Sequence, residues 1–264
     1  MTNRDKIQIF EQTELMRLRF ERKYSVVFAR VINNQIKSWL KEADSEGFEV
    51  AANNVGMYAT YDSMRRAFFD MYVEVGRSFN KVTENEIKSA LGRFETKDFE
   101  MPDSVFVMNL NTFIDQQLGR KITFINQTTQ SWMTKSVARV TEIGIKRGDN
   151  INTITENLRS FFAQEVPDFA AWRARRIART EVVSASNYSK SQVMETIAPD
   201  GLRRIWIADM RDLERTREAH QNVEPVGMRD KFNVGGEFLE YPGDPNGSAG
   251  NVINCRCTVG IERI

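Results

Sequence analysis

The residues best suited to chemistry lie in the last third of the chain. His220 is the only histidine among the 264 residues, and Cys255 and Cys257 are the only cysteines. An imidazole and two thiolates are ligands that Zn²⁺ favours, and a carboxylate or a water molecule can complete its tetrahedral coordination. Asp209 or Asp212, which precede the histidine, could supply that carboxylate. These five residues form a candidate zinc site.

The spacing of the two cysteines leaves a second interpretation open. Only Arg256 separates them, whereas structural zinc sites favour two or more intervening residues. A disulfide across one residue would be strained, and the chain has no other cysteine, so a disulfide framework is excluded and a reducing compartment fits. The alternative to a metal is a pair of half-buried thiols beside a hydrogen-bonded histidine.

The residue patterns do not indicate an ordinary enzyme. The chain has no Gly-rich phosphate loop and no serine nucleophile elbow, and a single histidine leaves most acid–base schemes to carboxylates. A zinc-dependent hydrolase would need an open metal position and a general base, for which Glu214, Glu218 and Asp244 are candidates. A structural role is the main prediction, and a zinc-dependent hydrolase is the alternative.

Charge excludes a general nucleic-acid coating protein but leaves room for a local contact. Lys and Arg total 37 and Asp and Glu total 36, which gives a net charge of +1. Arg173, Arg175 and Arg179 form a basic helical segment that could contact nucleic acid or the carboxylates of a partner. Internal ion pairs are the competing interpretation. No run of eighteen apolar residues occurs, so no membrane segment is predicted.

Long helices must position these residues. Apolar residues recur at steps of three and four over residues 5–45 and predict one amphipathic helix, which Gly47 interrupts. A second helix is predicted to end near Gly76. A helix-start signal opens a mostly helical segment over residues 102–147, with an interruption at Gly119. The first two hundred residues are therefore predicted to be dominated by helices.

Two further helices are predicted before residue 200. Thr153 and Glu156 have the spacing of a capping box, in which side chain and backbone cap each other at a helix start. Asp168 follows Pro167 and is predicted to be the N-cap of the next helix, which extends to about Met194.

The remainder of the chain is predicted to be mixed. Residues 204–208, 235–239 and 258–261 have the composition of short strands. The predicted fold class is α+β, with predominantly long amphipathic helices and a small C-terminal α+β unit. The amphipathic helix over residues 5–45 has so little obvious partner that contacts with another subunit are also expected.

Several short motifs follow one another in a distinctive order. They are Arg176-Ile177-Ala178-Arg179-Thr180-Glu181, Asn187, the set Trp206, Asp212, Arg215, Arg217 and His220, then Pro242-Gly243-Asp244-Pro245, and finally Asn254-Cys255-Arg256-Cys257. Over roughly residues 125 to 260 this order resembles the phage Mu F-like minor head protein family, also called the phage head morphogenesis domain. The first hundred residues carry none of the resemblance.

The resemblance implies a phage or prophage virion protein of the capsid interior or portal vertex, assembled in the host cytoplasm. Such a protein assists head morphogenesis, DNA packaging or genome delivery; the alternative is a hydrolase acting during infection. The implied partners are the portal or major capsid protein, further copies of the chain, and packaged DNA. Together with the helical pattern, this predicts three domains: a helical docking or oligomerisation region (1–100), the helical part of the head-morphogenesis-like domain (101–200) and a small α+β unit with the His220, Cys255 and Cys257 knot (201–264).

Carried over residue by residue, the resemblance gives signature positions and structural ones. The signature positions are Asp212, Arg215, His220, Cys255 and Cys257. The structural positions are Arg176, Thr180, Glu181, Trp206, Arg215, Arg217, Asp244 and Asn254. The family commonly has Asp-x-Arg shortly before the histidine, whereas Asp212 and Arg215 are separated by two residues here. Asp209 is therefore the alternative acidic partner.

Overall fold

The chain folds into two compact units, each built from separate stretches of sequence. The computed structural model describes residues 1–92, 100–197, 199–209 and 212–264. Unit 1 comprises Met1–Lys23, Phe69–Gln117 and Ala178–Ile264, and unit 2 comprises Tyr24–Phe68 and Leu118–Ile177. The three predicted domains, with boundaries near residues 100 and 200, stay a prediction. The first of these boundaries adjoins residues 93–99, which lie outside the described residues.

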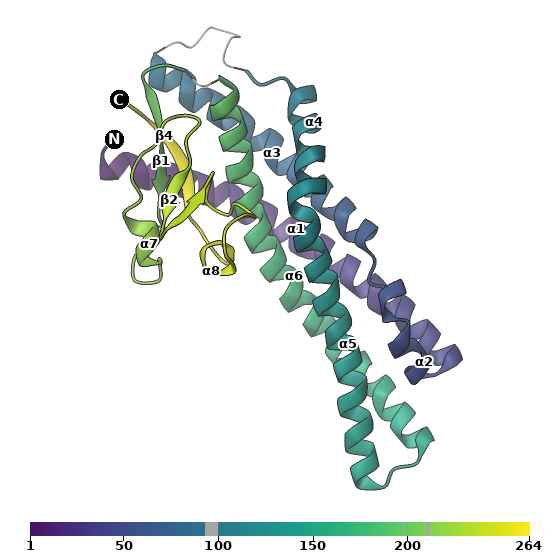
Figure 1. Cartoon of the computed structure of the whole chain (residues 1–264). Helices are drawn as coiled ribbons and strands as arrows, with labels where there is room; N and C mark the ends of the chain where they lie inside the picture. Colours follow the sequence, from purple (N-terminus) through teal and green to yellow (C-terminus); the bar gives the residue numbers. More distant parts are fainter. Residues whose placement is uncertain (93–99, 198, 210–211) are drawn as a thin grey trace. The chain divides into compact units, whose positions relative to one another are not determined.

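Helices make up most of the described residues, as predicted (Figure 1). They are α1 (Asn3–Glu46), α2 (Phe48–Asn53), α3 (Tyr61–Leu91), α4 (Asp103–Phe113), α5 (Gly119–Arg147), α6 (Ile151–Ile197), α7 (Glu218–Gln221) and α8 (Ala249–Val252). The single long first helix is confirmed, and Gly47 follows it with a left-handed φ of 91°. The interruption expected near Gly119 is a π-helical segment, Ile114–Leu118, between α4 and α5. None of the helices in the described part of the chain has the length and apolar character needed to cross a bilayer.

The predicted end of a helix near Gly76 is wrong, because α3 continues through this residue to Leu91. Gly76 serves packing rather than termination. A Cβ atom there would overlap the ring of Phe106 and lie 2.7 Å from the Ser189 hydroxyl oxygen. The glycine therefore lets α4 and α6 approach α3 closely, a reason that no local sequence signal could reveal.

The predicted boundary at Pro167 is also wrong, because α6 is one helix from Ile151 to Ile197 with the proline inside it. Its N-cap is Asn150, whose Oδ1 accepts a 3.0 Å hydrogen bond from the Thr153 backbone N–H, so the expected capping box does not start the helix. A proline inside a helix removes one backbone hydrogen bond. Burial of neighbouring Val166 and stacking of Phe169 on Trp132, with ring centroids 3.9 Å apart, offset this loss within unit 2.

The described residues form four short strands after α6, in two antiparallel pairs (Figure 1). β1 (Leu202–Ile207) pairs with β4 (Thr258–Arg263). β2 (Phe232–Val234) pairs with β3 (Glu237–Leu239) across a turn. Three of the four strands match predicted segments, and the α+β fold class with predominantly long helices is confirmed.

A buried asparagine on α6 holds the segment Asn254–Cys257, which we call the Cys loop. Asn187 Nδ2 donates to the carbonyl oxygens of Pro242 (2.8 Å) and Cys257 (3.0 Å). Asn187 Oδ1 accepts hydrogen bonds of 3.1 Å from the Thr258 hydroxyl and from a backbone N–H of β4. The side chain is fully buried, where an unmade hydrogen bond costs most. One residue therefore fixes the end of the Cys loop, the start of β4 and a second loop.

That second loop is Pro242-Gly243-Asp244-Pro245, and it lies directly against α6. Gly243 has a φ of 89°, and a Cβ atom there would lie 3.1 Å from the Cα of Ser184. Only glycine suits both the backbone angle and the close approach. The Ser184 hydroxyl donates a 2.8 Å hydrogen bond to the Gly243 carbonyl. Buried Asp244 closes the loop by accepting two backbone N–H bonds of 2.8 and 2.9 Å.

Replacement of Asn187 by alanine should lower the free energy of unfolding by about 3 kcal/mol or more, because it leaves buried backbone groups of both loops without partners. Asn157→Ala, on an exposed position of the same helix, is the matched control and should cost less than about 0.5 kcal/mol. Urea unfolding measures both values. Equal, small losses would contradict the role assigned to Asn187.

Candidate metal centre

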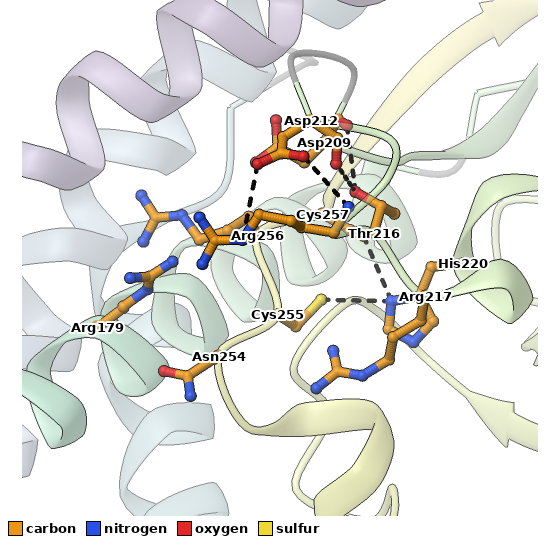
Figure 2. A pocket seen from close by; sticks show the side chains of 11 residues that line it. Arg179, Asp209, Asp212, Thr216, Arg217, His220, Asn254, Cys255, Arg256 and Cys257 are labelled. Carbon is orange, nitrogen blue, oxygen red and sulfur yellow. Dashed lines mark hydrogen bonds and ion pairs between the residues drawn. The ribbon is translucent and has the colours of Figure 1, made fainter.

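His220, Cys255 and Cys257 come together in unit 1, although 35 residues separate the histidine from the first cysteine. His220 lies on α7, and its Nδ1 is 3.6 Å from the Cys255 sulfur and 3.5 Å from the Cys257 sulfur (Figure 2). The potential ligand atoms all lie within 4.8 Å of one another. Each residue is at most 2 % exposed. One small ion could reach all three ligand atoms.

The imidazole is held in the orientation that metal binding needs. Its Nε2 lies 3.1 Å from Oδ1 of Asn251, and the Asn251 amide nitrogen donates to the Val234 carbonyl at 3.4 Å. Because Asn251 presents its oxygen, Nε2 donates the hydrogen bond, and Nδ1 is the ring nitrogen that faces the sulfurs and would bind a metal. The Trp206 ring packs edge-on against the imidazole, with centroids 5.4 Å apart.

The pKa values of the two buried thiols are shifted in opposite directions. The pKa of Cys255 lies well below its ordinary value because the Cys257 thiol hydrogen-bonds to its thiolate and His220 adds a second favourable interaction. The pKa of Cys257 lies well above its ordinary value because Cys257 donates that hydrogen bond and is buried beside a negative charge. The pair therefore gives up one proton readily and shares the other, which a divalent metal would displace.

A cavity of about 320 Å³ opens over the cluster, and Asp209 and Asp212 line it (Figure 2). Their carboxylates are not among the ligand atoms that gather within 4.8 Å. Asp212 Oδ1 instead accepts a 3.2 Å hydrogen bond from the Arg215 backbone N–H. A fourth metal ligand would come from a movement of one carboxylate or from a water molecule in the cavity.

Several positions named by the family resemblance support the loops around the cluster. Thr180 Oγ1 accepts a 3.5 Å hydrogen bond from the backbone of Asn254, which has a left-handed φ of 57°. Arg217 Nη2 donates to the Ile253 carbonyl at 2.7 Å, next to the Cys loop. Glu181 is buried on α6. The Thr180 contact attaches the Cys loop to α6, and the Arg217 contact attaches the residue before the Cys loop to the start of α7.

Two other positions lie away from the three ligand atoms. Arg215 is largely exposed, with its Nε 3.7 Å from Asp212 Oδ2 on the cavity rim. Arg176 belongs to unit 2, where its guanidinium lies 4.9 Å from the ring centre of Trp172. Their structural role stays a prediction.

The basic segment divides between the two units. Arg179 lines the cavity over the cluster, whereas Arg173 and Arg175 belong to unit 2. Arg173 Nη2 donates to the Ile125 carbonyl at 2.7 Å and contacts Thr128, so that guanidinium is used inside unit 2. Contact of these arginines with DNA or a partner stays a prediction.

Two residues at this site were missed by the sequence patterns. Asn251 is a common polar residue in a turn-rich stretch and carries no signal of its own. Arg17 is fully buried, and its Nη1 donates to the Arg256 and Cys257 carbonyl oxygens at 3.0 and 3.3 Å. The available signal was that Arg17 occupies a position on the buried face of α1, between Phe10 and Tyr24.

Comparison with known proteins agrees with the order of the motifs. A family model described as Phage Mu protein F like protein matches residues 135–260, which contain all the residues of the cluster. No curated protein and no solved structure matches the chain. The match supports a phage head morphogenesis protein that is virion-associated and has capsid-related partners. Residues 135–260 are therefore similar to the phage Mu protein F-like family over the stretch that holds His220, Cys255 and Cys257.

Proposed function

We propose that the chain is a minor head protein that associates with the portal or the inner face of the capsid. A zinc ion bound by His220, Cys255 and Cys257 locks its C-terminal unit, and the role is structural rather than catalytic. The protein assists head assembly, DNA packaging or genome delivery from the capsid interior or portal vertex. The observation that carries this proposal is the convergence of three buried ligands inside a phage Mu protein F-like domain.

The donor set suits zinc. Two thiolates and an imidazole are common ligands of structural zinc, and the hydrogen bond between His220 Nε2 and Asn251 fixes the orientation of the imidazole. Asp209, Asp212 or a water molecule from the cavity would complete the coordination. When bound, the ion would supply a cross-link between α7 and the Cys loop.

A locking role suits the local structure. The helices α7 and α8 have four residues each, and β2 and β3 have three, so none of them is stable without tertiary support. A bound metal contributes directly to the folding free energy of such segments. The hydrolase alternative gains no support from the described residues.

The N-terminal helices supply the docking contacts in this proposal. The side chains of Leu15 and Val26 on α1 are 64 % and 59 % exposed. A portal subunit, a capsid subunit or a neighbouring copy would cover them. The first hundred residues also lie outside the family match, as expected for a region that adapts a shared domain to its own partner.

The purified chain should contain about one zinc ion per molecule by elemental analysis. His220→Ala and Cys255→Ser should lose the ion, because each removes one ligand, whereas Arg215→Gln, on the rim of the same cavity, should retain it. Removal of zinc by a chelator should lower the free energy of unfolding by several kcal/mol. A folded wild-type protein that binds no zinc would contradict the metal centre.

Co-expression with the portal and major capsid proteins of the same phage or prophage tests the proposed location. The wild-type chain should co-sediment with portal rings or procapsids, and a Leu15→Asp, Val26→Asp double variant should co-sediment less, because charges replace apolar contacts. Glu11→Gln, exposed on the same helix, is the control. A chain that never associates with portals or capsids at any assembly stage would contradict this location.

A further inference from the structure

The first helix carries three charged side chains where it meets the Cys loop. Glu14, Arg17 and Glu21 are separated by three and four residues, so they share one face of α1. Glu14 is 2 % exposed and Arg17 is fully buried. Charged residues are almost never buried unless they are paired, so this face must have a specific polar partner.

That partner is the middle of the Cys loop. Arg17 Nη1 donates to the Arg256 carbonyl at 3.0 Å and to the Cys257 carbonyl at 3.3 Å. The Arg256 side chain points back to α1 and forms ion pairs with both Glu14 and Glu21. The backbone and the side chain of the residue between the two cysteines are therefore both held by α1.

Arg17 is also fastened to α6 and placed beside the thiols. Its Nε donates to the Ser186 hydroxyl at 2.8 Å, one residue before Asn187. The guanidinium is fully buried where it contacts the Cys257 carbonyl, and arginine carries its positive charge at neutral pH. A fixed positive charge at this place offsets the repulsion between two thiolates that must approach one ion.

We propose that Glu14, Arg17 and Glu21 of α1 form a clamp that positions the Cys loop for metal binding, with Arg17 as the principal positioning residue. This inference rests on the proposed zinc site and adds its intramolecular partner. The clamp lies outside the family match, which begins at residue 135, so in this proposal a segment beyond the matched residues supports the metal site. By reciprocity, zinc binding strengthens the attachment of this part of α1.

Zinc affinity, measured by competition with a chromogenic chelator, tests the clamp. Arg17→Met should weaken zinc binding about 10- to 100-fold, because it removes the hydrogen bonds that hold the backbone beside the metal ligands. Arg17→Lys keeps the charge and should recover part of the loss, whereas Arg19→Met, exposed on the same helix, should bind as the wild type does. Wild-type affinity in a folded Arg17→Met variant would overturn the proposal.

Two further readouts separate failure of the clamp from failure of the metal site. In wild-type protein, zinc should slow backbone amide exchange over residues 10–23 of α1, and protection confined to the Cys loop would overturn the clamp. If wild-type protein binds no zinc, the metal site fails and the clamp is judged by alkylation of the two cysteines. The cysteines of Arg17→Met should then be alkylated about tenfold faster than those of the wild type and of Arg19→Met. Arg17→Lys replaces Arg17→Met in this comparison if Arg17→Met does not fold. Equal alkylation rates would overturn the clamp.

Discussion

Buried polar groups in the C-terminal region have to find partners, and Asn187 satisfies four of them at once. The Cys loop and the Pro242–Pro245 loop contribute few apolar side chains to the core, so hydrophobic burial alone could not fix their positions. A hydrogen bond formed away from water is costly to break because its groups cannot turn to solvent. The position of α6 therefore determines where Cys257 and the start of β4 lie. The rest of the cluster follows from this attachment.

Several of the family motifs contact one another around Asn187. Asn187 holds both loops, and Gly243 permits the close approach of one of them to α6. His220 then faces the two sulfurs, and Asn251 orients it. Motifs that are far apart in the sequence thus belong to one polar network in unit 1. Outside the family match, Arg17 adds a positive charge and two hydrogen bonds to the same loop. This part of α1 is therefore a member of the same hydrogen-bond network.

The sequence predicted elements and chemistry that depend on local patterns. Helical periodicity identified α1, β-rich composition identified β1 and β4, and the scarcity of histidine and cysteine drew attention to the three residues that meet. Features decided by tertiary contacts could not be predicted. Gly76 resembles a helix end, but it lies inside α3 and packs against Phe106. Pro167 resembles a helix boundary, but it lies inside α6. The position of Arg17 between Phe10 and Tyr24 on one helix face indicates burial, but its partners in the Cys loop are decided by tertiary contacts.

The central claim is that His220, Cys255 and Cys257 hold one zinc ion in a site that the polar network has already shaped. X-ray absorption at the zinc edge, on the purified chain, tests it most directly. The expected result is two sulfur neighbours at about 2.3 Å and a nitrogen neighbour at about 2.0–2.1 Å. A zinc environment of oxygen and nitrogen atoms alone, or a protein without a zinc edge, would contradict the claim.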